Sequence, residues 1–180
     1  DRWGHTVVLD VAGDALVAFG GFGAGSGPHG RLASLATRPA ARPLARWTKL
    51  SVRGTAPTAR QYHCAWMSLP SRRMWVFGGR TTPHSLLDDV CQFDVGAGCW
   101  RSTRVSGDVP SARARATATP LGDGRVLLLG GRVHLGGNTF SSVPLDHGFI
   151  FTEDRNDPEA ATWTRVELGG DVPTPRHSHA

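Results

Sequence analysis

The sequence predicts an all-β protein built from repeated four-stranded antiparallel sheets. Its 180 residues include 23 glycines and 12 prolines, a composition that favours short strands joined by turns over long helices. An apolar run ending in a glycine pair occurs three times, and a tryptophan follows each pair. A chain of this length can bury a hydrophobic core.

The repeated unit has a period of about 50 to 60 residues, which is typical of a repeat architecture. Its marks keep one order: a glycine pair, a tryptophan, and a proline-containing turn that ends in arginine. The chain itself begins with a similar phrase, "RWGH". The glycine pairs are Gly20–Gly21, Gly78–Gly79 and Gly130–Gly131, the tryptophans are Trp47, Trp100 and Trp163, and the arginines are Arg2, Arg60, Arg113 and Arg176.

These marks divide the chain into units at about residues 2–55, 56–108 and 109–171, with the start of a further unit at 172–180. In the second unit we expect strands near residues 62–68, 74–77, 89–94 and 100–105, separated by turn residues. The glycine pair suits a strand end where φ is positive or where another backbone comes close. The tryptophan is expected to cover the apolar face between adjacent sheets.

The first and third units depart from this pattern. In the first, residues 20–30 are rich in glycine and residues 30–47 replace the regular third strand, while in the third a long connection spans residues 132–151. The glycine spacing of residues 20–30 resembles a phosphate-binding loop. Because neither a helix nor a G-K-[ST] motif follows, we interpret it as a flexible loop between strands.

The order of glycine pair, aromatic strand, tryptophan and P-x-x-R-x-x-H resembles the kelch repeat family. The segment "LLDDVCQFDVGAGCW" at residues 86–100 is similar to the family's repeat almost position for position. The resemblance implies a kelch-type β-propeller fragment of four-stranded antiparallel blades. Such propellers close with about 5 to 7 blades, so three units imply part of a larger chain or assembly.

Composition limits the possible partners and compartments. The net charge is +5, and 19 of the 20 basic residues are scattered arginines, which permits but does not require an acidic or nucleic-acid partner. Three cysteines without a C-x-x-C motif favour a reducing, cytoplasmic setting over a disulfide framework or zinc site. We expect no membrane span and no secretion signal, because no long apolar run occurs and residues 1–5 already resemble folded sequence.

We predict no catalytic residue, metal site or cofactor in this chain. His5, His63 and His179 each lie three residues after a repeat arginine, so a structural role is favoured over a ligand set. Asp88 and Asp89 are neighbours on a strand and point to opposite faces. The copper oxidases related to galactose oxidase also resemble kelch propellers, but they need more tyrosines than the single Tyr62.

The resemblance implies a binding surface on the loops that follow the glycine pairs and on those that enter the next blade. The candidate partner-binding residues are Phe22, Gln61, Tyr62, Arg80, Thr81, Arg115, Arg132, His134 and His177. Arginine with aromatic residues suits an acidic or extended peptide, which predicts a non-catalytic interaction or scaffold module. Two alternatives stay open: an accessory domain of a larger enzyme such as a tRNA-modifying methyltransferase-like protein, and a basic RNA-binding surface.

Overall fold

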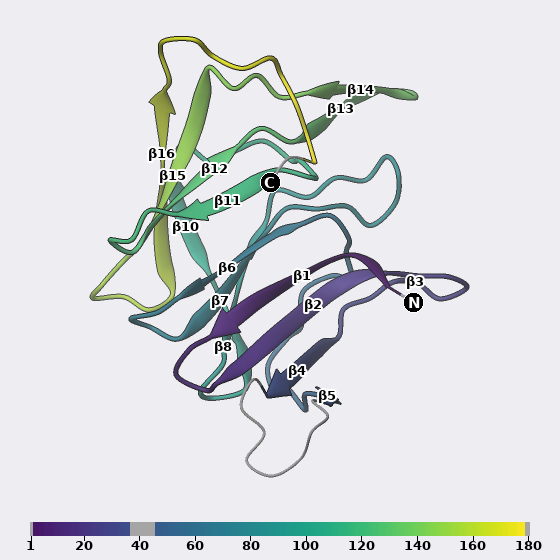
Figure 1. The fold of residues 1–180 in the computed structure, drawn as a ribbon, viewed down its shortest axis with the longest axis vertical. Coiled ribbons are helices and arrows are strands. Elements are labelled where there is room, and N and C mark those ends of the chain that lie inside the picture. Colours follow the sequence, from purple (N-terminus) through teal and green to yellow (C-terminus); the bar gives the residue numbers. More distant parts are fainter. Residues whose placement is uncertain (1, 37–45, 179–180) are drawn as a thin grey trace.

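The computed structural model describes residues 2–36 and 46–178, and this part of the chain is all-β, as predicted. Its strands form three blade-like sheets, which follow one another along the chain (Figure 1). The first blade has the order β1-β2-β4-β5, with β3 added to the end of β2. The bounds are β1 (Trp3–Asp10), β2 (Ala15–Gly23), β3 (Gly27–Pro28), β4 (Leu32–Ala36) and β5 (Trp47–Lys49).

The glycine-rich stretch at residues 20–30 is more ordered than the loop we expected. Strand β2 continues beyond the glycine pair to Gly23 and then turns back to pair with β3. Of the following irregular connection, residues 37–45 lie outside the described residues, and β4 pairs regularly with both β2 and β5. The first blade therefore keeps the repeat pattern despite its unusual sequence.

The second blade contains the four antiparallel strands that the sequence predicted. They are β6 (Cys64–Ser68), β7 (Arg73–Phe77), β8 (Val90–Asp94) and β9 (Cys99–Arg101), in that spatial order. The expected fourth strand over residues 100–105 is divided. Strand β9 ends at Arg101, and β10 (Arg104–Gly107) crosses to the third blade, where it pairs in parallel with β16.

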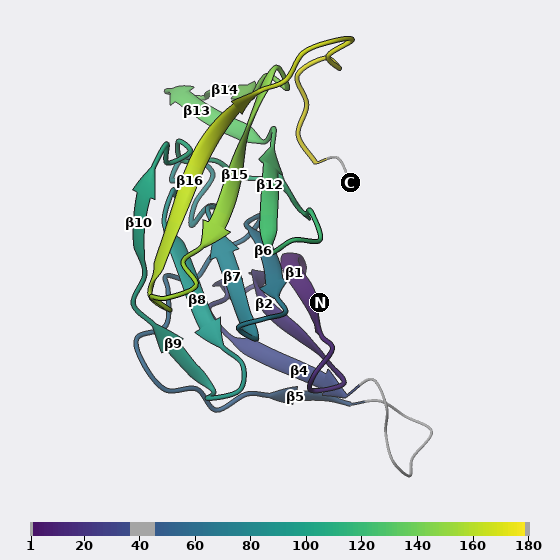
Figure 2. The ribbon, with the colours of Figure 1, turned by 90° about the vertical axis from the view of Figure 1, so that its left-hand side faces the viewer.

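The third blade has the order β10-β16-β15-β12-β11, and Figure 2 shows β10 along its outer edge. Its remaining strands are β11 (Thr117–Pro120), β12 (Arg125–Leu129), β15 (His147–Glu153) and β16 (Ala160–Glu167). The long connection that we expected after the third glycine pair contains a separate hairpin, β13 (Arg132–Gly136) with β14 (Thr139–Ser142). This hairpin extends away from the blades on one side of the molecule (Figure 1).

The main chain also joins the first two blades at their outer edges. Arg53, just after β5, forms a parallel bridge with Cys99, and its carbonyl accepts a hydrogen bond from the Trp100 amide at 2.9 Å. The segment after each of the first two blades thus becomes an edge of the following sheet. Because this pairing joins segments that lie far apart in the sequence, the periodicity of the sequence does not reveal it.

The hydrophobic core lies in two layers, one at each junction between blades. Phe19 of the first blade packs with Phe93 and Trp100 of the second, and all three are buried. At the next junction Trp75 is 0% exposed and Trp163 is 1% exposed. No helix of the described residues is both long and apolar enough to cross a membrane.

Candidate functional site

Four equivalent residues at the start of successive repeats have a left-handed backbone. Gly4, Tyr62, Arg115 and Ser178 have φ values of 65°, 56°, 60° and 57°. The Tyr62 amide donates to the Gly4 carbonyl at 2.7 Å, the Arg115 amide to the Tyr62 carbonyl at 2.8 Å, and the Ser178 amide to the Arg115 carbonyl at 3.1 Å. This continuous main-chain ladder links the blades and fixes the side chains that project from it.

Two arginines lie over the ring of Tyr62. The guanidinium carbon of Arg115 is 4.2 Å from the ring centroid and that of Arg80 is 4.9 Å from it. Arg80 follows the second glycine pair, and it exchanges two backbone hydrogen bonds with Gln61, at 2.9 and 3.0 Å. The glycine-pair loop and the entering loop therefore hold both cations against the Tyr62 ring, at distances typical of cation–π contacts.

The β13–β14 hairpin contributes a second arginine–aromatic pair. The guanidinium carbon of Arg132 is 4.1 Å from the centre of the Phe140 ring, and its backbone pairs with Ala114. His134 lies beside Phe140, at 5.0 Å between ring centroids, and His84 lies within 5.3 Å of His134. We call Tyr62, Arg80, Arg115, Arg132 and Phe140 the arginine–aromatic cluster, which the two histidines flank.

The cluster carries positive charge that no carboxylate of the described residues compensates by an ion pair. None of the ion pairs formed within residues 2–36 and 46–178 involves its three arginines. Burial lowers the pKa of Arg80, and the charges of Arg115 and Arg132 lower it further against the opposing influence of Tyr62. Guanidinium groups remain protonated in proteins, so this repulsion favours binding of an anion.

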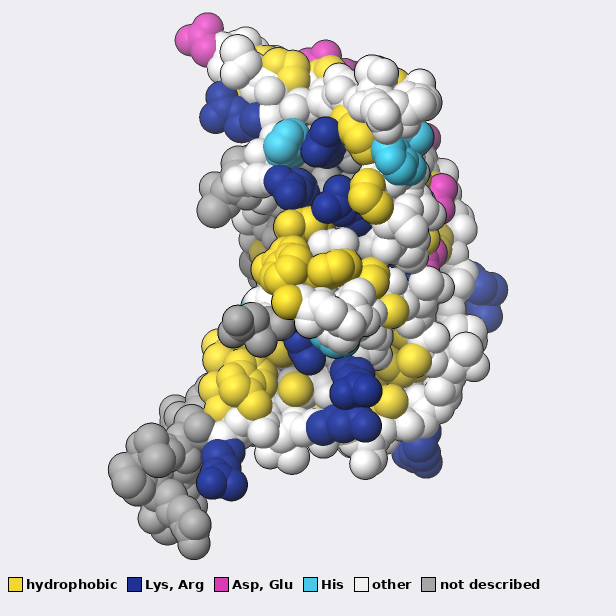
Figure 3. All heavy atoms as spheres, turned by 90° about the vertical axis from the view of Figure 1, so that its right-hand side faces the viewer, with side chains coloured by type: hydrophobic (Ala, Val, Ile, Leu, Met, Phe, Trp, Pro, Cys, Tyr) yellow, Lys and Arg dark blue, Asp and Glu magenta, His cyan; other side chains and the backbone are white. Residues whose placement is uncertain are grey.

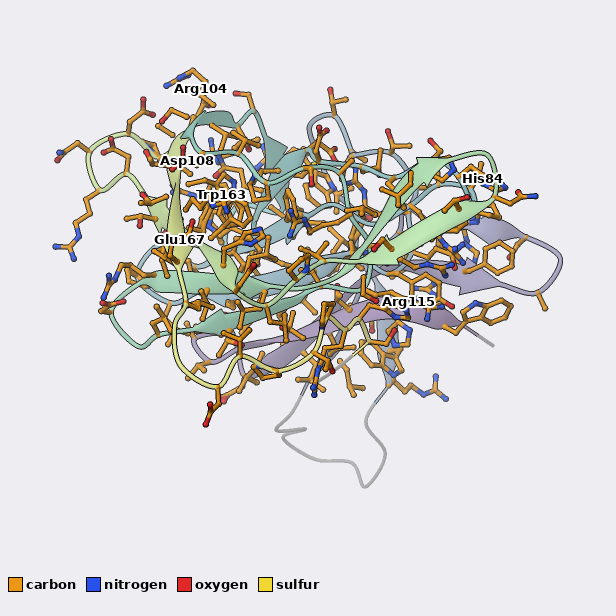
Figure 4. All side chains as sticks on the ribbon, turned by 90° about the horizontal axis from the view of Figure 1, so that it is seen from above. His84, Arg104, Asp108, Arg115, Trp163 and Glu167 are labelled. Atoms are coloured by element: carbon orange, nitrogen blue, oxygen red, sulfur yellow. The ribbon has the colours of Figure 1, made fainter. Side chains whose placement is uncertain are left out.

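The space-filling view shows how these charges are distributed. Arginine and histidine side chains alternate with apolar ones on the face in Figure 3, while acidic side chains lie mainly toward its margin. His84 and Arg115 lie at one end of the molecule in Figure 4, and the acidic Asp108 and Glu167 lie at the other. Beside the cluster is a cavity of about 230 Å³, whose lining includes Tyr62, Arg115 and Ser178.

Six of the nine residues that we predicted for partner binding belong to the cluster or lie beside it. Tyr62, Arg80, Arg115 and Arg132 belong to the cluster itself, and His134 flanks it. His177 is adjacent, because its Nδ1 lies 3.1 Å from Ser178 Oγ, and that hydroxyl accepts a hydrogen bond from Arg115.

The other three predicted residues occupy different surroundings. Phe22 packs against Trp3 at 4.8 Å between ring centroids. Gln61 is 4% exposed, so its side chain does not present itself to a partner in this conformation. The Thr81 amide donates to the Ser85 carbonyl, which shapes the loop beyond Arg80.

The glycine pairs and two of the repeat arginines lie where the backbone packs closely or where side chains are buried. All six paired glycines have positive φ, and a Cβ on Gly78 would lie 2.6 Å from the Arg113 carbonyl oxygen. Arg60 is fully buried and forms two hydrogen bonds to Asp89, at 2.6 and 2.7 Å. Arg113 donates instead to the carbonyls of Ser111 and Gly130, and burial lowers its pKa to about 10.

The two remaining repeat arginines and the recurring histidines differ in exposure. Arg176 is exposed and donates to the Thr174 carbonyl at 3.1 Å, whereas Arg2 packs its side chain near Gly21. His63 is 5% exposed and shares a 2.7 Å hydrogen bond with Thr6 of the first blade. His179 lies outside the described residues.

The buried state of His63 predicts a loss of stability in mild acid. Burial and the nearby charge of Arg60 lower the pKa of His63 to about 3, from an ordinary value of 6.5. The folded protein therefore resists protonation that the unfolded chain accepts, and folding stability falls as the pH drops from about 6.5 toward 3. We expect a slope approaching about 1.4 kcal/mol per pH unit from this residue.

The measurement is urea unfolding across that pH range, with His63→Gln as the comparison. The variant lacks the titrating ring, so the difference between the two curves isolates His63 from the other titrating groups. We expect the variant to be less stable at pH 7. We also expect its free energy of unfolding to change less with pH below pH 6.5. Parallel curves would contradict a buried neutral imidazole.

Sequence reasoning missed several residues around the cluster. His84 lies in a loop and Phe140 on the hairpin, and neither belongs to the repeat pattern from which the candidates were drawn. Gly4 was noted only as part of "RWGH", although its missing side chain makes room for Tyr62. A Cβ at Gly4 would lie 3.1 Å from that ring. The sequence signal that could have identified this position is its recurrence at the start of successive repeats, at Gly4, Tyr62, Arg115 and Ser178.

Comparisons with known proteins agree with this architecture. Residues 1–180 match the KLHDC2/KLHL20/DRC7 Kelch-repeats domain. The chain is 36% identical over 132 residues to the tRNA wybutosine-synthesizing protein 2/3/4 of Arabidopsis thaliana, covering 72% of this chain and 12% of that protein. It is 30% identical over 163 residues to the Rho GTPase-activating protein gacHH of Dictyostelium discoideum, covering 91% and 10%.

A solved structure, that of YjhT, superposes with a TM-score of 0.62 at 16% sequence identity. The match covers 91% of this chain and 45% of that one. At this identity the likeness concerns the fold. The chain thus spans only about a tenth of the two relatives named above and less than half of the solved one.

Proposed function

Since the chain belongs to the KLHDC2/KLHL20/DRC7 Kelch-repeats domain family, we propose that it is a non-catalytic protein-interaction module. We propose further that its arginine–aromatic cluster binds an acidic or extended peptide. The observation that supports this most directly is the convergence of Arg80, Arg115 and Arg132 without a carboxylate partner among the described residues. The cytoplasm is the compartment that we propose, from the cysteine usage alone.

The geometry suits recognition by rigid loops. Main-chain hydrogen bonds fix the backbone of Tyr62, Arg80 and Arg115. The contacts of both guanidinium groups with the Tyr62 ring restrain the side chains, so less freedom is lost on binding. Each guanidinium presents donors that match a carboxylate, and the aromatic rings offer apolar area to neighbouring peptide groups. The left-handed backbone at Tyr62 and Arg115 is a costly conformation for residues with a Cβ, and such strain is concentrated at functional sites.

Replacing Arg80 and Arg132 together by alanine is expected to weaken acidic-peptide binding by about a hundredfold or more. The reason is that each charge-assisted hydrogen bond contributes roughly 1.5–3 kcal/mol, and about 1.4 kcal/mol corresponds to a tenfold change in affinity. Fluorescence polarisation with labelled Asp/Glu-rich peptides measures the effect. The melting temperature should change little, because both side chains lie partly exposed.

A matched control removes the same charge elsewhere. Arg155→Ala with Arg165→Ala also lowers the net charge by two, but both of these arginines are exposed and away from the cluster. We expect the control to retain nearly all of the peptide affinity. Equal weakening by both double variants would show attraction to net charge rather than a site.

RNA binding is a second candidate, supported by the same uncompensated arginines and by the similarity to a tRNA wybutosine-synthesizing protein. In that case the domain would serve as an accessory part of a larger enzyme. The two candidates differ in salt dependence, since each phosphate neutralised on single-stranded RNA adds about 0.7 to the slope of log K against log salt. A steep slope with RNA and no acidic-peptide binding would favour the accessory role.

A further inference from the structure

A cavity of about 390 Å³ lies between the second and third blades. The turn that joins β6 to β7 and the turn that joins β11 to β12 form its rim. In Figure 1 both turns point to the left, whereas the β13–β14 hairpin, which carries Phe140 of the arginine–aromatic cluster, extends to the right. The cavity and the cluster therefore lie on opposite sides of the molecule.

The wall of this cavity is mainly apolar. Trp66, Val126 and Phe151 form its buried part, and Leu69 and Pro70 lie at its exposed rim. Leu69 is 65% exposed, although the second blade has a described blade on either side of it. This exposure is therefore a property of the turn itself. An apolar cavity with an exposed apolar rim is typical of a site that takes an apolar group.

One carboxylate lies in this apolar wall. The Glu153 side chain is 15% exposed, and its Oε1 accepts hydrogen bonds from Ser71 Oγ at 2.7 Å and from Trp75 Nε1 at 2.9 Å. Its Oε2 accepts a hydrogen bond from Ser68 Oγ. An adjoining cavity of about 730 Å³ also includes Glu153 in its lining. A polar group placed among apolar ones is what orients a ligand in such a cavity.

The repeat does not require a carboxylate at this position. In the third blade, Glu153 lies two residues after Phe151, which pairs with the repeat tryptophan of that blade. In the second blade, Val95 lies two residues after Phe93, which pairs with its own repeat tryptophan. Val95 packs against the adjacent core layer. The fold therefore accepts an apolar residue here, and the carboxylate of the third blade indicates a role in binding.

The hydrogen bonds around Glu153 leave three acceptors open. Ser68 and Ser71 each donate their one hydroxyl proton to Glu153, so lone pairs remain on both hydroxyl oxygens. Oε2 can accept a second hydrogen bond, because Ser68 is its one donor among the described residues. Arg73 Nη1 is 3.7 Å from Oε1, which is too far for a hydrogen bond. Three acceptors beside a carboxylate match the three N–H groups of a primary ammonium.

We propose that this cavity binds the side chain of a lysine from a partner protein. The ammonium group donates to Glu153 Oε2 and to the hydroxyl oxygens of Ser68 and Ser71, while the methylene groups lie against Leu69 and Pro70. Lysine fits because its stem is apolar and its charged end carries three donors. The site is separate from the arginine–aromatic cluster, so this proposal does not depend on acidic-peptide binding there.

Titration with the peptide acetyl-Gly-Leu-Lys-Leu-Gly-amide, followed by proton–nitrogen NMR of the protein, is the test. The indole N–H of Trp75 is the reporter, because it donates to Glu153. We expect its resonance to shift along a saturable curve, while the indole resonance of Trp3 in the first blade stays in place. The same peptide with Nε-acetyl-lysine should not shift Trp75, because acetylation removes the charge.

Two variants and a matched control test the assignment to Glu153. Glu153→Gln should raise the dissociation constant of the lysine peptide by at least about tenfold, as expected when a charge-assisted hydrogen bond is lost. Glu167→Gln makes the same change at the opposite end of the β15–β16 pair and should leave the affinity unchanged. Arg73→Gln should lower the dissociation constant, because it removes a positive charge that competes for the carboxylate.

Several outcomes would overturn the proposal. A Trp75 resonance that ignores the lysine peptide, or that responds equally to its acetylated form, would exclude an ammonium site. Tighter binding of n-pentylamine than of the peptide would assign the cavity to a free amine instead of a partner's lysine. Equal weakening by Glu153→Gln and Glu167→Gln would show attraction to net charge alone. A dissociation constant that does not fall in Arg73→Gln would contradict a cationic ligand.

Discussion

Replacing Trp163 by alanine is expected to lower the free energy of unfolding by about 3–5 kcal/mol, the usual cost of deleting a buried indole. Its side chain is 1% exposed. The ring centroid is 4.9 Å from that of Phe151 in its own blade and 5.4 Å from that of Phe77 in the second blade. The substitution therefore removes packing both within the third blade and between two blades. Urea denaturation followed by circular dichroism measures the loss.

Trp3→Ala is the matched control for this prediction. Trp3 is also a strand tryptophan, but it is 43% exposed, and within the described part of the chain its one aromatic contact is with Phe22. We expect a loss below about 1.5 kcal/mol, the upper range for one aromatic pair. Trp163→Phe should fall between the two, since it keeps most of the apolar contact. Similar losses for Trp3→Ala and Trp163→Ala would contradict a core centred on the junction between blades.

The sequence predicted the parts of the fold that depend on local chemistry repeated at a fixed spacing. The glycine pairs could be identified because only glycine adopts a positive φ without cost, and the strands because β-branched and aromatic residues alternate between turns. The role of the repeat tryptophan was correct for Trp100 and Trp163, which fill the layers between sheets. Trp47 holds the equivalent position in the first blade, where no other sheet of the described residues covers it, and it is half exposed.

The features that the sequence did not reveal depend on contacts between distant segments. Strand β10 looked like the end of the second blade's fourth strand, and nothing in residues 104–107 shows that they pair with β16. The candidate site also depends in part on contacts between segments that are distant in the sequence. The loop positions of Tyr62 and Arg115 were predicted, whereas the approach of Phe140 depends on a hairpin that lies outside the repeat.

The left-handed ladder connects the fold to the proposed function. The same backbone position that joins one blade to the next also places Tyr62, Arg115 and Ser178 side by side. Gly4 occupies that position without a side chain, and the Tyr62 ring lies over it. Sequence variation at this position therefore changes the proposed binding surface, while the hydrogen bonds of the ladder itself join main-chain atoms.

Breaking the ion pair between Arg60 and Asp89 from the arginine side is expected to be among the most destabilising single changes. Arg60→Met removes a fully buried guanidinium that donates to Asp89 and to the carbonyls of Thr58 and Gly78. We expect a loss of about 3–5 kcal/mol, because disrupting a buried pair leaves polar groups without partners. Urea unfolding at pH 7 measures it.

A double-mutant cycle with Asp89→Asn separates the ion pair from the packing of Arg60. The Asp89 side chain is 45% exposed, so water can partly replace its partner, and the single Asp89→Asn change should cost less than Arg60→Met. Once Arg60 is gone, adding Asp89→Asn should cost almost nothing, and this non-additivity measures the coupling between the two groups. Additive losses would mean that the pair contributes no specific stabilisation.

The pH dependence of the same variants gives a second readout. Burial favours the neutral form of Asp89, but the hydrogen bonds and charge of Arg60 outweigh it and lower the pKa of this carboxyl below its ordinary 3.8. Its contribution to stability is therefore present above about pH 4 and is lost as the pH falls below that value. Arg60→Met should flatten the loss of stability below about pH 4. The loss between pH 6.5 and 4 should persist, because burial is the largest cause of the lowered pKa of His63 and the charge of Arg60 adds to it. An unchanged pH dependence below pH 4 would show that Arg60 does not set the titration of Asp89.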